Sequence, residues 1–186
     1  MIPASEIRKG TVLEMDGNMY RVMNTQYNNP GRGAASMRAQ LMDIGTGTTQ
    51  YRVFSAEESL NNIYVETEDV KYLYGDADFL HFMNNETYEQ LEVSKEVLGD
   101  DLVFLTPNMQ VELEFYENQP LSATLPVSVV LEIVETDPVM KNANATGSYK
   151  PAKLENGVVV GVPPYMETGE KIRVKVEDRT YMERVK

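Results

Sequence analysis

The sequence predicts an all-β protein made of several small barrels or sandwiches. Apolar and polar residues alternate over short stretches, turn sequences recur between these stretches, and helix signals are few. Alternation with a period of two is typical of strands that bury one face. Many short strands joined by frequent turns are the usual content of small closed β-structures, so we expect folds of that kind.

The first two long strands are expected in the stretches NMYRVMNTQY and ASMRAQLMDI. In the first stretch, Tyr20 and Val22 fall on one face and Arg21 falls on the other. In the second stretch, Arg38 and Gln40 share the polar face. Its expected buried residues are Met37, Ala39 and Leu41.

Two later stretches, VELEFYE and KIRVKVED, show the same alternation. Each places apolar side chains on one face and charged side chains on the other, as a half-buried strand requires. The expected buried residues are Val111, Leu113 and Phe115 in the first and Ile172, Val174 and Val176 in the second.

Turns and short helices connect these strands. Ser55 and Glu58 fit a capping box, but the apolar run that follows supports only one turn. Ser94 is expected to cap a short helix that ends at Gly99. The clearest turn sequences are Asp16-Gly17-Asn18, Pro30-Gly31, Gly45-Thr46-Gly47, Asn118-Gln119-Pro120 and Asn156-Gly157.

The net charge of −12 comes from the middle of the chain. Residues 1–65 hold six basic and six acidic side chains, residues 66–127 hold two and fourteen, and residues 128–186 hold nine and nine. We therefore place domain boundaries near residues 65 and 127, which gives three domains of about 60 residues each. The neutral outer domains can contact an RNA backbone, whereas the acidic middle domain would be repelled by one.

Several classes of function find no support in the sequence. It has no cysteine, no apolar run near the ~20 residues of a membrane helix and no signal-peptide core, so we expect a cytoplasmic protein without membrane contact. His81 alternates with Phe79 and Met83, which favours a structural role in a strand. Acidic pairs such as Asp76 and Asp78 are more typical of a solvated turn than of a catalytic or calcium site. We expect no metal, no cofactor and no enzymatic activity.

The stretch NNPGRGAA is predicted to be a turn that holds out one long side chain. Pro30 fixes φ for the second position of a type I or II turn, and Gly31 supplies the positive φ that type II requires at the third. Gly33 and the alanines that follow add no bulk, so Arg32 projects alone. Its guanidinium offers five donors in a planar fork, which suits phosphate, ribose and base edges. On spacing alone, an ordinary exposed loop tip is the preferred explanation.

The C-terminal stretch YMERVK holds a second candidate. Tyr181 and Arg184 lie three residues apart at the end of a strand pattern. A tyrosine and an arginine so placed can stack on and clamp a sugar–phosphate backbone. Without further context, a charged and fraying tail is the simpler explanation.

The chain resembles the bacterial elongation factor P family over essentially its whole length. The resemblance is carried in order by IRKGTVLEMDGNMYRVM, NPGRGAA, YLYGDADFLHFMNNETYEQLEV, LEIVETDP and KPAKLENGVVVGVPPYMETGEKIRV. It implies an SH3-like (KOW-like) barrel over residues 1–65 followed by OB-folds over residues 66–127 and 128–186. It also implies that the three barrels are arranged in an L shape similar to tRNA.

The resemblance further implies a monomeric translation elongation factor that binds the ribosome, both its RNA and its proteins, beside the P-site peptidyl-tRNA. The factor would relieve stalling at consecutive prolines by positioning that tRNA, not by catalysis of its own. Arg32 takes the loop-tip position that reaches toward the acceptor end of the tRNA. The residues implied to bind tRNA or ribosome are Pro30, Gly31, Arg32, Gly33, Tyr181 and Arg184. The last two match a pair that faces the anticodon arm.

Arg32 is also the position where an arginine-modifying enzyme would act. Many family members carry a modified lysine at the tip, a chemistry that arginine cannot take, and some carry a rhamnosylated arginine followed by asparagine where this chain has Gly33. The stretches RGAA, GEKIR and RTYMERV also resemble the elongation-factor-P-like paralogues, whose tip arginine acts unmodified. Arg32 is therefore either modified, as in some members of the family, or bare, as in the paralogues.

A different alternative for the function of the whole protein is a general single-stranded RNA-binding protein with OB-folds.

Two stretches depart from the pattern of the family. Many members have an acidic loop, implicated in reading the exit-site codon, where this chain has Asn142-Ala143-Asn144. The last turn, near Asp178 and Arg179, lacks the glycine that is usual there.

Overall fold

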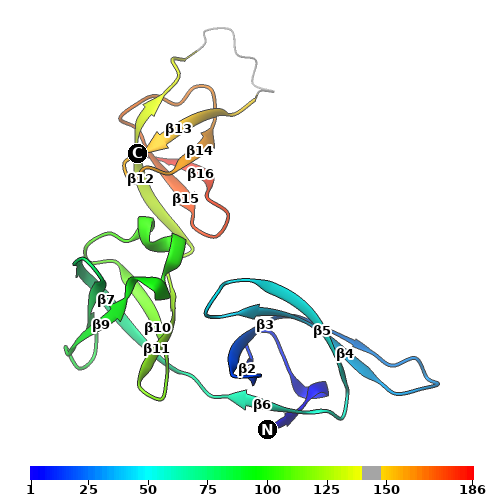
Figure 1. Cartoon of the computed structure of the whole chain (residues 1–186). Helices are drawn as coiled ribbons and strands as arrows, with labels where there is room; N and C mark the ends of the chain where they lie inside the picture. The colour runs from blue at the N-terminus through cyan, green and yellow to red at the C-terminus, as the bar shows by residue number, and fades with distance from the viewer. Residues whose placement is uncertain (140–147) are drawn as a thin grey trace. The chain divides into compact units, whose positions relative to one another are not determined.

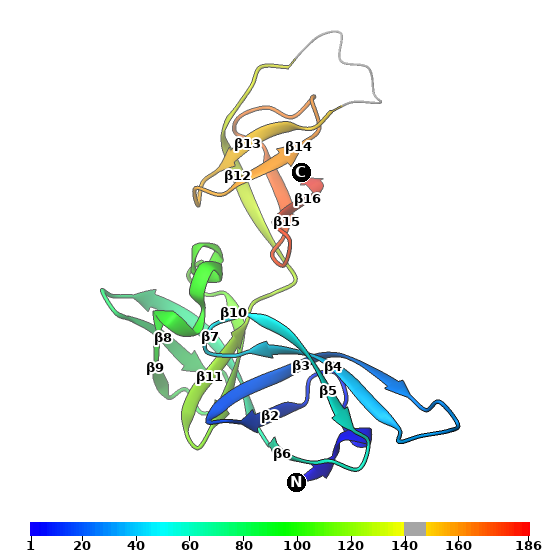
Figure 2. The same ribbon diagram turned by 45° about the vertical axis from the view of Figure 1, so that its right-hand side comes forward.

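The computed structural model describes residues 1–139 and 148–186, and strands make up most of it (Figure 1). These residues form two compact units, one of Met1–Glu68 with Leu113–Ser122 and one of Asp69–Glu112 with Ala123–Lys186. Their strands form three sheets, each of them curled (Figure 2). The predicted all-β class is thus confirmed. The departure at Asn142-Ala143-Asn144 lies outside the described residues.

The first sheet has the strand order β1-β6-β2-β3-β4-β5. The alternation predicted for its two long strands is confirmed, because Val22, Met37, Ala39 and Leu41 are all buried in one core. In Figure 2 the ribbon made by β3 and β4 projects from the curled sheet, with its connecting loop at the free end. The strands are β1 (Ile2–Pro3), β2 (Val12–Met15), β3 (Asn18–Asn28), β4 (Ser36–Asp43), β5 (Thr49–Ser55) and β6 (Ser59–Ile63).

The second sheet has the order β11-β10-β7-β8-β9. The apolar face predicted for β10 is buried, since Val111, Leu113 and Phe115 are at most 9% exposed. The turn before β11 differs slightly from the prediction, because it is made by Glu117 and Asn118, both with positive φ, and proline cannot adopt that conformation. The strands are β7 (Glu66–Gly75), β8 (Phe79–Asn84), β9 (Gln90–Ser94), β10 (Gln110–Tyr116) and β11 (Gln119–Thr124).

The third sheet has the order β14-β13-β12-β15-β16. The predicted buried residues Ile172, Val174 and Val176 lie in its core. Phe104, which precedes this sheet in the chain, is fully buried in the same core. The strands are β12 (Ser128–Thr136), β13 (Lys150–Leu154), β14 (Val159–Val162), β15 (Lys171–Lys175) and β16 (Thr180–Val185).

The helical segments are short 3-10 turns. The Ser55 backbone N–H donates to Glu58 Oε2 at 3.1 Å within a single turn, as predicted. Ser94 caps η2 (Lys95–Val97), also as predicted, but Gly99 does not end the helical region, because η3 (Gly99–Phe104) follows at once. A further turn, η1 (Ala4–Glu6), was not predicted. Among the described residues, no helix is long and apolar enough to cross a membrane.

Candidate nucleic-acid interface

The loop of residues 29–35 closes the β3–β4 ribbon. Strand pairing reaches Asn28 opposite Ser36, and the Ala56 N–H donates to the Ala35 carbonyl at 2.9 Å, so the base of the loop is anchored. Gly31 and Gly33 have φ values of 72° and 109°, in the region that favours glycine. A Cβ at either position would meet nothing within 4 Å, so glycine is needed there for backbone conformation and not for space.

Arg32 lies exposed between these two glycines. Within residues 1–139 and 148–186, its guanidinium makes no hydrogen bond or ion pair. The described part of the first unit holds other arginines that are engaged: Arg8 bonds to backbone carbonyls, Arg21 to Glu114, and Arg52 to Asp16 at 3.7 Å. The full set of guanidinium donors of Arg32 is therefore unused within the described residues.

Tyr181 and Arg184 both lie on β16, and a β-bulge brings them to one face. Residues three apart on a regular strand point to opposite faces. Here Tyr181 pairs with Val174 while Arg184 pairs with Ile172, and the register shifts between these pairs. Because Val174 and Ile172 share a face, their partners share it too. Spacing in the sequence alone would have separated the two side chains.

The two residues have different surroundings. The Tyr181 ring packs against the core of the third sheet, and burial, together with a hydrogen bond with Tyr165, raises the pKa of its hydroxyl to about 12. Arg184 is half exposed and forms an ion pair with Glu170 at 2.5 Å. Tyr181 is thus a neutral, anchored platform, and Arg184 is a cation held in place by a carboxylate.

A hollow of about 330 Å³ lies next to Tyr181. Exposed Tyr149 forms part of its wall, and the Cβ of Tyr149 would be 3.2 Å from a Cβ added at Gly161. Arg179 has a positive φ of 54° and places its guanidinium 5.7 Å from the Phe104 ring centroid, where it donates to the Asp100 carbonyl at 3.2 Å. Nothing local to Tyr149 or Arg179 in the sequence predicts that they lie next to Tyr181.

His81 and Asp76 form a structural pair in the second sheet. His81 Nε2 lies 2.7 Å from Asp76 Oδ2, and the imidazole stacks on the Tyr74 ring with centroids 4.4 Å apart. The other carboxylate oxygen of Asp76 accepts hydrogen bonds from the backbone N–H groups of Asp78 and Phe79. The carboxylate is therefore used to hold a turn. No group of three or more metal-ligating side chains occurs among the described residues.

This pair predicts an acid-dependent loss of stability. The hydrogen bond with His81, helped by two backbone N–H groups, lowers the pKa of the Asp76 carboxyl from 3.8 to about 2. A lowered folded-state pKa means that the stabilisation is fully present above pH 3.8 and is lost as the pH falls through about 2. We expect Asp76→Asn to lower Tm at neutral pH, with a difference from wild type that shrinks toward pH 2. Thermal denaturation across this range measures the effect, with Asp78→Asn as the control; a difference that does not change with pH would contradict it.

Comparisons with known proteins cover the whole chain. Residues 3–60 match the family model of the Elongation factor P (EF-P) KOW-like domain, residues 65–123 that of the Elongation factor P (EF-P) OB domain, and residues 129–184 that of Elongation factor P, C-terminal. The curated elongation factor P proteins of Rickettsia bellii and Rickettsia rickettsii are 46% and 45% identical over 186 residues, 100% of this chain and 99% of each relative. Among solved structures, a translation initiation factor eif-5a family protein from Naegleria fowleri aligns with a TM-score of 0.51 and 12% identity over 67% of this chain and 96% of its own, a likeness of fold alone.

Proposed function

Because the chain belongs to the elongation factor P family, and so is a translation elongation factor, we propose that it binds the ribosome beside the P-site peptidyl-tRNA and stimulates peptide-bond formation at consecutive prolines. It acts in the cytoplasm as a monomer and performs no chemical step itself. Its contribution is positional, because an ordered peptidyl-tRNA reaches the reactive geometry more often. The division into domains at residues 65 and 127 is part of this proposal, and the ranges of the three matching family models support it.

The observation that carries the proposal is the presentation of Arg32. A loop with an anchored base and two glycines of positive φ holds one guanidinium at the end of a projecting ribbon. Among the described residues this group has no protein partner, so its charge and five donors are directed outward. The acceptor end of a tRNA offers phosphates, riboses and base edges that match these donors.

The C-terminal pair supports a second contact with the same class of partner. Tyr181 offers an anchored ring and Arg184 offers a held cation on one face of β16. Aromatic stacking and a guanidinium are the two groups that most often contact a nucleic-acid backbone and its bases without reading the sequence. We assign the exposed parts of these two side chains, at the edge of the core, to contact with the anticodon arm of the tRNA.

A reconstituted translation system tests the proposal. The purified protein, added to a system without any such factor, should raise the yield from a message that encodes a run of prolines. A matched message without consecutive prolines should translate equally well with or without it. Equal stimulation of both messages would exclude the proposed role. Tight, salt-sensitive binding to free oligonucleotides without selective rescue would instead support a general RNA-binding protein.

The state of Arg32 is decided by mass spectrometry of the protein from its native cells. A deoxyhexose-sized addition on a peptide containing Arg32 would establish modification and imply a dedicated enzyme. The unmodified mass would establish that Arg32 acts, if it acts, as a bare guanidinium. Because trypsin does not cleave well at a modified arginine, a different protease should generate the peptide.

A further inference from the structure

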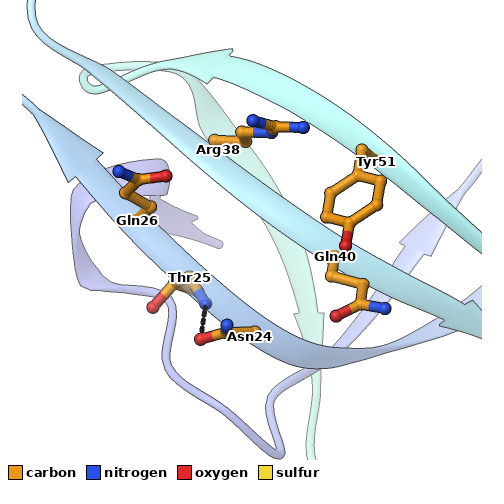
Figure 3. A pocket seen from close by; sticks show the side chains of 6 residues that line it. All are labelled: Asn24, Thr25, Gln26, Arg38, Gln40 and Tyr51. Atoms are coloured by element: carbon orange, nitrogen blue, oxygen red, sulfur yellow. Dashed lines mark hydrogen bonds between the residues drawn. The ribbon is translucent and has the colours of Figure 1, made fainter.

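A hollow of about 220 Å³ lies on the outward face of β3, β4 and β5 in the first unit (Figure 3). Strand pairing brings its walls together, since Gln26 lies opposite Arg38, and Gln40 lies opposite both Asn24 and Tyr51. Residues directly opposite each other on neighbouring strands point to the same face of a sheet, so these side chains converge. The lining residues are Asn24, Thr25, Gln26, Arg38, Gln40 and Tyr51.

Arg38 and Tyr51 form the centre of this hollow. The guanidinium carbon of Arg38 lies 4.7 Å from the centroid of the Tyr51 ring, a cation–π distance. Tyr51 is 63% exposed, Arg38 is also exposed, and Arg38 has no carboxylate partner within the described ranges. Both groups are therefore pre-arranged and accessible to a ligand.

The residues that line the hollow carry no negative charge, in contrast to the chain as a whole. No Asp or Glu lines it, although the chain has 29 acidic residues and a net charge of −12. The remaining lining groups are mainly amides, those of Asn24, Gln26 and Gln40, which offer both donors and acceptors. A cation, an aromatic ring and amides without a carboxylate complement an anionic ligand with a planar ring and hydrogen-bonding edges.

We propose that this hollow binds one nucleotide of a single-stranded RNA segment, and this inference rests on the proposed function. Tyr51 stacks on the base, Arg38 contacts the phosphate, and the amides of Asn24, Gln26 and Gln40 bond to the ribose or base edges. The same ribbon carries Arg32, and the chain between Arg32 and Arg38 can span at most about 20 Å. The hollow therefore extends the loop-tip contact along an unpaired stretch of the same RNA.

Direct titration of the full chain tests the binding site. A short unstructured oligoribonucleotide, added to the isotopically labelled protein, should shift the amide NMR signals of Arg38 and Tyr51. Tyr51→Ala should weaken the binding of this oligonucleotide by about 5- to 100-fold, the loss expected for one stacked base. Tyr51→Phe keeps the ring and should bind within about twofold of wild type. Arg38→Gln should weaken binding and reduce the salt slope of log K by about one.

The matched control is Arg52→Gln. Arg52 lies next to Tyr51 on β5, but its guanidinium is engaged with Asp16 and lies over Phe54 instead of lining the hollow. Arg52→Gln removes the same charge as Arg38→Gln, from the neighbouring strand β5, but at a position outside the hollow, so it should leave oligonucleotide affinity unchanged. If Arg52→Gln weakens binding as much as Arg38→Gln, the effect is one of net charge and the proposed subsite is wrong. NMR shifts that are absent from the hollow with RNA, or present only with a peptide ligand, would overturn it as well.

The translation assay separates this inference from the proposed function. If the wild-type protein fails to rescue the proline-run message, the proposed function fails, whatever the hollow binds. If the wild type rescues the message, Tyr51→Ala and Arg38→Gln should need a several-fold higher concentration for half-maximal rescue. Rescue by both variants at the wild-type concentration would overturn the subsite and leave the function intact.

Discussion

Replacement of Arg32 with alanine should abolish most of the selective rescue of a proline-run message. Arg32 is exposed and makes no hydrogen bond or ion pair with another described residue, so the fold and Tm should not change. Hydrogen bonds to a charged group are worth about 1.5–3 kcal/mol, which corresponds to roughly a 10- to 100-fold loss in the rate of the step that they assist. The measurement is single-turnover peptide-bond formation between prolines on stalled ribosomes, with and without the factor.

Two variants give this prediction its controls. Arg32→Lys keeps the charge but loses the planar fork, so it should retain only part of the activity. Arg52→Ala removes an arginine of the same sheet that already has a partner in Asp16 and should remain fully active. Wild-type activity in Arg32→Ala would show that the loop tip is not the working contact.

Replacement of Glu114 with glutamine should destabilise the first unit by about 2–3 kcal/mol. Glu114 and Arg21 form an ion pair with two parallel contacts, and the Ser122 hydroxyl donates to the same carboxylate. The Glu114 side chain is only 13% exposed and the Arg21 side chain 18%. Loss of one partner from a fully buried pair costs about 3–5 kcal/mol because the other charge is left uncompensated, and this pair retains some solvent contact.

The effect is measured by urea denaturation followed by circular dichroism. Glu112→Gln is the matched control, since Glu112 is on the same strand but exposed, and it should change stability by less than about 0.5 kcal/mol. A double variant, Arg21→Met with Glu114→Leu, removes both charges and should recover most of the loss. If Glu114→Gln and Glu112→Gln are equally stable, the ion pair does not stabilise this unit.

Much of the first sheet could be predicted because its signals are local. The burial of Val22 and Leu41 follows from alternation within a few residues, and the positive φ of Gly31 follows from the sequence of its own turn. Membership of the family also followed from short stretches spread along the chain, and the three family models match the chain over the ranges that hold most of these stretches. The turn after β10 lies at Glu117 and Asn118, earlier than the predicted Asn118-Gln119-Pro120, because both of its residues have positive φ, which Pro120 cannot adopt.

The sequence by itself determined the all-β class, the inward-facing residues of the main strands, the exposed loop that carries Arg32 and the family of the chain. Only the tertiary structure decided which distant residues meet. The pairing of Arg21 with Glu114, the bulge that puts Tyr181 and Arg184 on one face, and the register that sets Arg38 beside Tyr51 all depend on contacts between separate strands. Alternation fixes the face of each side chain within its own strand, but register and bulges fix its neighbours across strands. Those are set by the packing of the whole sheet and not by any short stretch of sequence.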